Sequence, residues 1–463
     1  MNTPLIWILL PMLAAGTSLF FLRYRYILRW SGLGFGLILV VSGLVLPINE
    51  VFKFLFWEVK LSEQLLIFGR RFILSGADRP IVILLFSLWL FWLLIMDPKL
   101  VPAQFIPLSL AGICLILTAY SVEPIFYGAL FFAFLALIYV VLLSPPGKEP
   151  TPGVLRFLIF QILGMLFILF AAWLASWIDL NSGNQVMLAR SLLILALGFS
   201  FLLSIFPFIS WISMVSERNH PFLSGYIFNT YFLGVFLFGT RFILEGGWIG
   251  QGLNIQLPFQ LAGVIMLSYG GLMAIFSKHL GRLMGAVIIA EIGRSLLAIS
   301  LFQAGFPIYF GMVILQSISL GVWSISLTQL QQGIQDLDFQ SADGAARLWP
   351  VITSGLLLGY FALAGVPLLG GFPIYWALGS GLSYYPLWIN SIFVLSTLGL
   401  VYGGLRLLGV LTKNAGEESI LILAAPFYRY LILGLNVLLV LIGFLPQLIF
   451  RLTRTISDLL LGS

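Results

Sequence analysis

Long apolar runs dominate the chain, and short polar segments separate them. A transmembrane helix needs roughly 20 mostly apolar residues. By that length the sequence predicts fourteen spans, near 4–22, 27–47, 80–97, 101–120, 124–144, 154–177, 190–213, 221–243, 255–276, 282–303, 306–330, 349–378, 384–411 and 426–450. The runs are too long and unbroken for barrel strands, in which polar and apolar residues alternate. We therefore expect an all-α polytopic membrane protein with about fourteen transmembrane helices.

Two of the predicted helices carry helix-breaking residues at membrane depth. The first break surrounds Pro207, and the second contains Pro367, Gly370, Gly371 and Pro373. A Phe-Pro pair followed by Trp occurs in both breaks, 166 residues apart. Interrupted helices at matching points of two halves are typical of inverted-repeat transporters, although proline also kinks membrane helices without such a role. The pattern favours two inverted five-helix repeats with one broken helix in each.

These repeats divide the chain into four segments. We expect N-terminal helices 1–3 in residues 1–100, the first repeat with helices 4–8 in 101–243, the inverted second repeat with helices 9–13 in 255–411, and helix 14 with a short tail in 426–463. Thirteen Lys and Arg follow odd-numbered spans, and nine follow even-numbered spans or the last one. The positive-inside rule then predicts that both termini lie outside a bacterial cytoplasmic or thylakoid membrane.

The composition excludes several classes of protein. Hydrophobic residues make up 60% of the chain and charged residues 9%, whereas soluble domains average about a quarter charged residues. This balance excludes a soluble enzyme and a nucleic-acid-binding protein. The one cysteine, Cys114, lies in an apolar run, which argues against disulfides and thiolate metal clusters. We expect no metal site, no cofactor in this chain, and contact with lipids.

Four segments resemble the motifs of a known family, in that family's order: 68–78, 202–211, 278–293 and 362–372. In the third, KHLGRLMGAVIIAEIG is similar to the family's DLKRLLAYSSIxxxG, and in the fourth, ALAGVPLLGGF is similar to SLAGIPPxxGF. On these motifs the chain resembles the antiporter-like subunits of respiratory complex I, which are shared with Mrp sodium/proton antiporters and membrane-bound hydrogenases. The resemblance implies fourteen helices and two inverted five-helix repeats.

The resemblance also implies a proton path that this sequence lacks. The family carries a buried Glu on its fifth helix and a Lys on each of its seventh, eighth and twelfth helices. Those positions fall here on Phe132, on Leu202, on Phe232 or Leu233, and on Tyr375. A proton crosses hydrocarbon only on titratable groups and water. We therefore expect the family's proton path to be interrupted in this chain.

A few polar residues remain inside the predicted spans. Glu291 and Arg294 lie three residues apart on the tenth helix and so share a face. They are interpreted as an ion pair that fixes helix packing, with a residual ion site or gate as the alternative. Gln161 and Gln316 each lie one span ahead of a break. They either hydrogen-bond neighbouring helices or line residual water.

The resemblance implies a membrane-arm subunit of an NAD(P)H- or ferredoxin-quinone oxidoreductase of the complex I type. With the proton-carrying residues replaced, we expect a structural or proton-inactive subunit without a catalytic site. Its partners would be other membrane subunits of a large hetero-oligomeric translocase, and only those partners would hold quinone, flavin and iron–sulfur clusters. One alternative is an active proton or cation transporter with a rewired path near Glu291 and Arg294. Another is a scaffold subunit of a photosynthetic or carbon-uptake complex.

Overall fold

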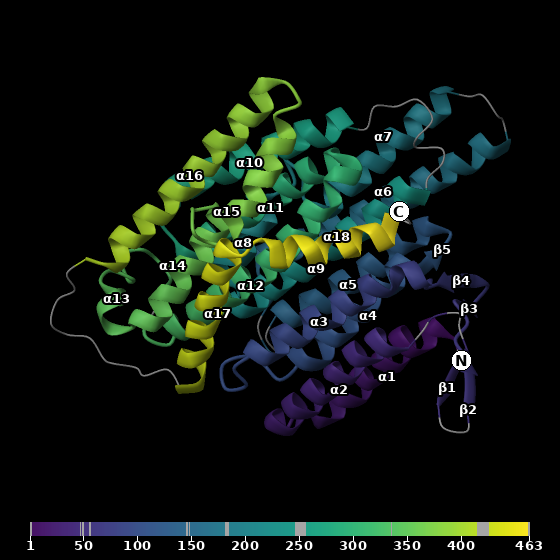
Figure 1. Ribbon diagram of the computed structural model, residues 1–463, viewed down its shortest axis with the longest axis horizontal. Coiled ribbons are helices and arrows are strands. Elements are labelled where there is room, and N and C mark those ends of the chain that lie inside the picture. The colour runs from purple at the N-terminus through teal and green to yellow at the C-terminus, as the bar shows by residue number, and fades with distance from the viewer. Residues whose placement is uncertain are drawn as a thin grey trace.

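The computed structural model describes residues 2–46, 48, 51–54, 57–144, 147, 149–180, 185–245, 256–334, 336–413 and 426–461. It is a bundle in which many helices run roughly parallel to one another while the C-terminal helix lies across them, and the two chain ends lie on the same side in the view of Figure 1. In chain order its α-helices are α1 (Leu10–Ser18), α2 (Arg25–Val45), α3 (Arg79–Ile95), α4 (Phe105–Ser121), α5 (Gly128–Leu143), α6 (Pro152–Leu180), α7 (Gln185–Leu202), α8 (Ser210–Arg218), α9 (Pro221–Glu245), α10 (Gln256–Phe276), α11 (Leu280–Ser300), α12 (Phe306–Leu330), α13 (Ala345–Leu348), α14 (Pro350–Ala364), α15 (Gly371–Leu382), α16 (Leu387–Leu411), α17 (Pro426–Phe444) and α18 (Gln447–Leu461).

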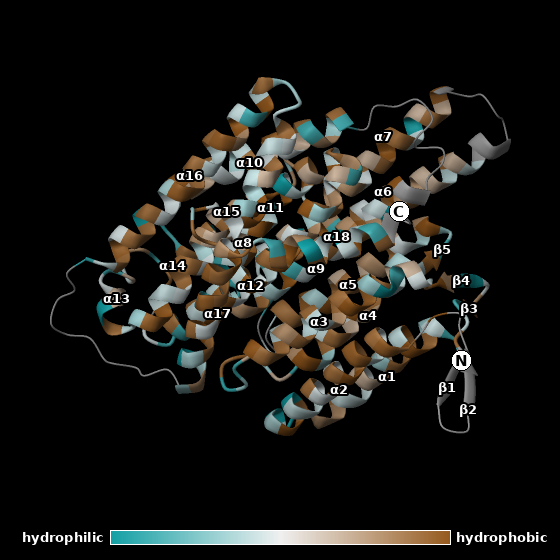
Figure 2. Cartoon of the chain, in the orientation of Figure 1, coloured by the Kyte–Doolittle hydropathy of each residue, from teal (hydrophilic) through white to brown (hydrophobic). Residues whose placement is uncertain are grey.

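The helices confirm an all-α polytopic membrane protein. Within the described residues, ten helices are long and apolar enough to cross a membrane, and four apolar helices are shorter. Each overlaps one of the ranges that the hydrophobic pattern predicts. Figure 2 shows that α1 and α2 are largely hydrophobic and that hydrophilic residues gather at the turn that connects the two helices. This distribution is the one expected of helices whose ends lie in water and whose middles lie in lipid.

The predicted ranges differ from the helices at three places. Range 190–213 covers α7 and the start of α8, and range 349–378 covers α14 and much of α15. Range 426–450 runs past the end of α17 at Phe444, because Pro446 precedes a separate helix, α18. A continuous apolar run does not mark these ends, since proline and glycine interrupt a helix without lowering its hydrophobicity.

Short strands occupy part of the segment between α2 and α3, where the hydrophobic pattern predicts no element. Strand β1 (Val51–Phe54) pairs antiparallel with β2 (Trp57–Lys60). Strand β3 (Gln64–Ile67) pairs with β4 (Arg70–Ile73), and β4 pairs with β5 (Val122–Glu123), which directly follows α4. These strands lie beside the N-terminal end of the chain in Figure 1. They leave the bundle's interior entirely to helices.

Three helices form the centre of the bundle. In the most apolar 18-residue stretch of α11, 100% of the residues are buried, and in the corresponding stretches of α9 and α12 the shares are 94% and 89%. In the corresponding stretches of α2, α6 and α17 only 28% of the residues are buried, as expected of helices at the lipid boundary. Polar side chains on α11 therefore lie as far from both lipid and water as this fold allows.

Helix α11 lies close to α10 because each helix has a glycine at the contact. A Cβ atom added to Gly293 would lie 2.6 Å from the carbonyl oxygen of Gly263, and one added to Gly263 would lie 2.8 Å from that of Gly293. Small residues let membrane helices approach until their backbones touch. The position of α11, and of every side chain that it carries, depends on this contact.

We expect Gly293→Leu to lower the thermal stability of the protein, because the new side chain must push α10 away. Overpacking of this kind costs about 1–3 kcal/mol or more. Gly434→Leu on α17 is the matched control, since nothing lies within 4 Å of the Cβ that it would add. Thermal unfolding of both variants, followed by fluorescence-detected size exclusion, measures the difference. Equal melting temperatures would contradict the close contact.

Candidate functional site at the second helix break

Glu291 and Arg294 form an ion pair in the middle of α11. Arg294 Nη1 lies 2.6 Å from Glu291 Oε1, and the two side chains are 1% and 0% exposed. The other buried charged side chains among the described residues, Arg29, Asp97 and Arg241, lie within a few residues of a helix end. Burying a charge is costly unless it is paired and hydrogen-bonded. The surroundings of this pair therefore have to supply its remaining hydrogen bonds.

Arg294 supplies hydrogen bonds to the first half of the second broken helix. Helix α14 ends at Ala364, and Gly365 follows with φ +80°. The last carbonyl groups of a helix have no partner within it. Arg294 Nη1 donates to one of them, the carbonyl oxygen of Leu363, at 2.5 Å. A cation at this end also opposes the negative pole of the helix dipole. Arg294 thus stabilises the point at which α14 stops.

Glu291 holds the second half of the same broken helix. Tyr375 lies on α15, and its hydroxyl group donates to Glu291 Oε1 at 2.8 Å. The Arg294 guanidinium also lies 3.9 Å from the centre of the Tyr375 ring, within the range of a cation–π contact. We refer to Glu291, Arg294, Tyr375 and the Leu363 carbonyl as the clamp. It joins α11 to both pieces of the broken helix, α14 and α15.

Neutral groups hold the first broken helix. Helix α7 ends at Leu202 and α8 begins at Ser210, so Pro207 lies in the non-helical stretch between them. Across this stretch Trp211 Nε1 donates to Ser204 Oγ at 2.6 Å, and both side chains are buried. In the second break, Pro367 lies between the two helices, Gly370 precedes α15, and Gly371 and Pro373 belong to its first turn. The two breaks occupy similar places but are fixed by different chemistry.

Apolar and aromatic side chains fill the positions at which the family resemblance implies Glu and Lys. Phe132 and Leu202 are 0% exposed, and Phe232 and Leu233 are 3% exposed. The Phe132 ring packs against Phe238 at 5.3 Å between ring centres. Phe232 packs against Trp211 at 6.0 Å and Tyr231 at 5.5 Å. Glu291 of α11 lines one small cavity together with Phe232 and Leu233. The remaining position, Tyr375, belongs to the clamp.

The two glutamines that the sequence singles out lie at different sites. Gln161 is buried in the first half, where its Oε1 accepts a hydrogen bond from the Tyr231 hydroxyl group. Gln316 instead lines a small cavity together with Glu291 and Asn229. The structure therefore brings together three of the four candidates, Glu291, Arg294 and Gln316, and separates Gln161 from them.

The parts of the clamp that the sequence does not single out are the Leu363 carbonyl and the role of Tyr375. Tyr375 and Glu291 are 84 residues apart, so no local spacing connects them. The backbone carbonyl of Leu363 carries no sequence signal of its own. The available signal is the helix break itself, which predicts an unpaired carbonyl near Ala364 and hence a donor on a neighbouring helix.

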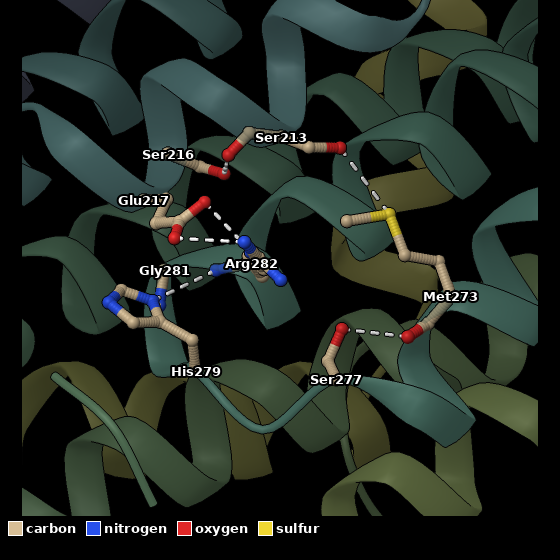
Figure 3. A network of polar contacts seen from close by, with 8 residues as sticks. All are labelled: Ser213, Ser216, Glu217, Met273, Ser277, His279, Gly281 and Arg282. Carbon is tan, nitrogen blue, oxygen red and sulfur yellow. Dashed lines mark hydrogen bonds and ion pairs between the residues drawn. The ribbon is translucent and has the colours of Figure 1, made fainter.

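A second polar network joins α8 to the start of α11 (Figure 3). His279 precedes α11, and its Nδ1 accepts hydrogen bonds from the backbone N–H of Gly281 at 3.0 Å and of Arg282 at 3.4 Å. The Arg282 side chain pairs with Glu217 of α8 at 2.8 Å and 3.0 Å. Burial lowers the pKa of His279, while the nearby Asp338 carboxylate opposes that shift. The neutral ring therefore caps α11.

Removing one charge of the clamp should destabilise the protein strongly. Glu291→Gln leaves Arg294 buried without a counter-charge, which costs about 3–5 kcal/mol in comparable cases. The double variant Glu291→Gln with Arg294→Met removes both charges and should recover part of that loss. Thermal unfolding of the wild type and both variants in one detergent tests this. A single variant as stable as the wild type would contradict the clamp.

The stability contributed by the His279 cap should depend on pH. Because its pKa is lowered in the folded state, this contribution is present above the ordinary value near 6.5 and is lost as the pH falls through the folded-state pKa. In His279→Asn the cap accepts hydrogen bonds without titrating, so the melting temperature should fall less between pH 7.5 and about 5. His220→Asn is measured in parallel, because burial also lowers the pKa of His220 and this second histidine adds its own share to the pH dependence. Identical pH profiles for His279→Asn and the wild type would contradict the cap.

Sequence comparison finds no family model that matches the chain. It is 25% identical over 200 residues to NADH-quinone oxidoreductase subunit N of Acidithiobacillus ferrooxidans, covering 43% of this chain and 41% of that protein. It is 26% identical over 277 residues to formate hydrogenlyase subunit 3 of Escherichia coli, covering 54% of this chain and 44% of that protein. The chain spans about half the length of the curated relatives that it matches.

Solved structures match the fold over almost the whole chain. A chain of respiratory complex I from Thermus thermophilus superimposes with a TM-score of 0.75 at 20% identity, covering 99% of both chains. A chain of the archaeal membrane-bound sulfane sulfur reductase gives 0.79 at 14% identity, and one of the Mrp complex from Dietzia sp. gives 0.77 at 12%, each covering 99% of this chain and 97% of the other. The chain thus shares the fold of membrane chains of respiratory complex I, the sulfane sulfur reductase and the Mrp complex, and part of its sequence is similar to NADH-quinone oxidoreductase subunit N and formate hydrogenlyase subunit 3.

Proposed function

We propose that this chain is a membrane-arm subunit of a complex I-type or related respiratory complex, and that it is structural and inactive in proton transport. The solved structures with the same fold come from multisubunit membrane assemblies. Other membrane subunits would be its neighbours. Flavin, iron–sulfur clusters and quinone would be bound by other subunits.

The observation that carries this proposal is the packing around Phe132, Leu202 and Phe232. Phe132 and Phe232 pack against aromatic rings and Leu202 is fully buried, at positions where a proton path would need a carboxylate and amines. Protons do not pass through hydrocarbon or packed rings without titratable groups and water. The chain's six lysines all lie outside its predicted spans. The first half of the molecule therefore acts as a seal across the membrane.

The clamp supports the same proposal for the second half. Arg294 is committed to the Leu363 carbonyl and to Glu291, and one Glu291 oxygen is committed to Arg294 and Tyr375. A residue that moves protons has to change partners as it titrates. In the clamp a change of charge on either residue would release a broken helix. The position of the clamp between α11 and the two pieces of the broken helix therefore favours a structural role.

The proposal includes the repeat architecture and the topology. The first repeat would comprise α4, α5, α6, α7 with α8, and α9, and the second α10, α11, α12, α14 with α15, and α16. The broken helix is then the fourth member of each repeat. Five helices per repeat invert the second relative to the first. All fourteen spans would cross the membrane with both termini outside, which leaves Arg23 and Arg25 on the inner side.

One observation favours a second candidate function. Glu291 Oε2 has no hydrogen-bond partner among the described residues, and Glu291 lines a cavity with Asn229 and Gln316. This arrangement would suit a transporter with a rewired path through Glu291. A scaffold role in a photosynthetic or carbon-uptake complex differs only in its partners. Mass spectrometry of the subunits that co-purify with a tagged chain distinguishes these hosts.

The double variant Glu291→Gln with Arg294→Met tests proton inactivity in the assembled host complex. We expect an unchanged number of protons translocated per electron pair in proteoliposomes, because no proton passes through the clamp. The amount of assembled complex is measured in parallel and is expected to stay the same or fall. A lower proton yield from fully assembled complex would overturn the proposal and favour the rewired path.

A further inference from the structure

Three buried polar atoms that lack a hydrogen-bond partner among the described residues belong to residues that line one cavity. They are Glu291 Oε2 on α11, Asn229 Nδ2 on α9 and the Tyr309 hydroxyl group on α12. The three residues are 1%, 2% and 1% exposed. All three line the same cavity of about 10 Å³, to which Gln316 and Ser295 also contribute. Each of three central helices thus contributes to the lining of this cavity a residue with an unpaired polar group.

Such a group of atoms is energetically unfavourable if nothing binds it. A buried donor or acceptor left unpaired costs about 1–3 kcal/mol, and more when it is charged. Buried polar atoms in proteins are therefore nearly always paired with protein or with ordered water. A cavity of about 10 Å³ is on the order of the smallest that holds one water molecule, provided that two to four polar partners are present. This cavity meets both conditions.

The chemistry of the three groups matches the hydrogen bonds of water. A carboxylate oxygen accepts, an amide nitrogen donates, and a phenol does either. A molecule bound here has to donate to Glu291 and accept from Asn229 and Tyr309. A water molecule can do all of this and still donate once more, toward Gln316 or Ser295. A metal cation would not fit, because Arg294 already neutralises Glu291 and the Asn229 nitrogen donates.

We propose that this cavity is a hydration site for one ordered water molecule, bound by Glu291, Asn229 and Tyr309. The site goes beyond the proposed function, because it is expected whether or not protons pass through the chain. Asn229 is held in place from its other side, where its Oδ1 accepts a hydrogen bond from Trp92 Nε1 at 3.1 Å. The water therefore connects the clamp on α11 to α9 and α3.

Tyr309→Phe distinguishes a hydrated cavity from a dry one by the sign of its effect. If water occupies the cavity, the variant loses a hydrogen bond and its melting temperature falls. If the cavity is dry, the variant removes an unpaired hydroxyl group and its melting temperature stays the same or rises. Tyr360→Phe calibrates the loss of one buried bond, since Tyr360 donates to the Leu400 carbonyl at 2.7 Å outside this cavity.

A high-resolution cryo-electron microscopy map of the chain in its native complex tests the site without any substitution. We expect a single density peak at hydrogen-bond distance, about 2.6–3.2 Å, from Glu291 Oε2, Asn229 Nδ2 and the Tyr309 hydroxyl group. An empty cavity in a map that resolves ordered water elsewhere would overturn the proposal. So would a melting temperature of Tyr309→Phe equal to or above that of the wild type.

Discussion

A helix that stops in the middle of a bilayer leaves carbonyl groups without partners, and hydrocarbon provides no replacement. In this chain Arg294 donates to such a carbonyl at the end of α14, and its counter-charge Glu291 binds Tyr375 at the start of α15. The pair lies on α11, in whose most apolar 18-residue stretch every residue is buried. One buried ion pair therefore holds both pieces of the broken helix to α11, and its charges are both paired and hydrogen-bonded, the condition under which buried charges are tolerated.

The two broken helices, one in each half of the molecule, are held in place by different chemistry. The first break is fixed by the neutral bond between Trp211 and Ser204, and packed rings around Phe132 and Phe232 surround it. The second break is fixed by charge. At the second break the Glu291 carboxylate binds both Arg294 and Tyr375. This difference is the physical basis for proposing a structural subunit rather than a proton carrier.

Hydrophobic length predicted the helices well, because the bilayer imposes it on every span. The two breaks were also predictable, since Pro207 and Pro367 cannot continue a helix. The strands around Arg70 and the separate helix α18 were not, because short strands and amphipathic helices lack a long apolar run. Glu291 and Arg294 were predicted to pair from their spacing on one helix. Their partners Leu363 and Tyr375 are distant in sequence, so only tertiary packing brings them to the pair.

Hydroxyl-radical footprinting of the intact host complex tests most directly whether the first half is a dry seal. Radicals generated from water label aromatic side chains that water reaches, and mass spectrometry locates the labels. We expect no labelling of Phe132 or Leu202, which are both 0% exposed, while Tyr384 of the same chain, which is 90% exposed, is labelled. Labelling of Phe132 to the same extent as Tyr384 would contradict the central claim, because it would place water where the packed rings exclude it.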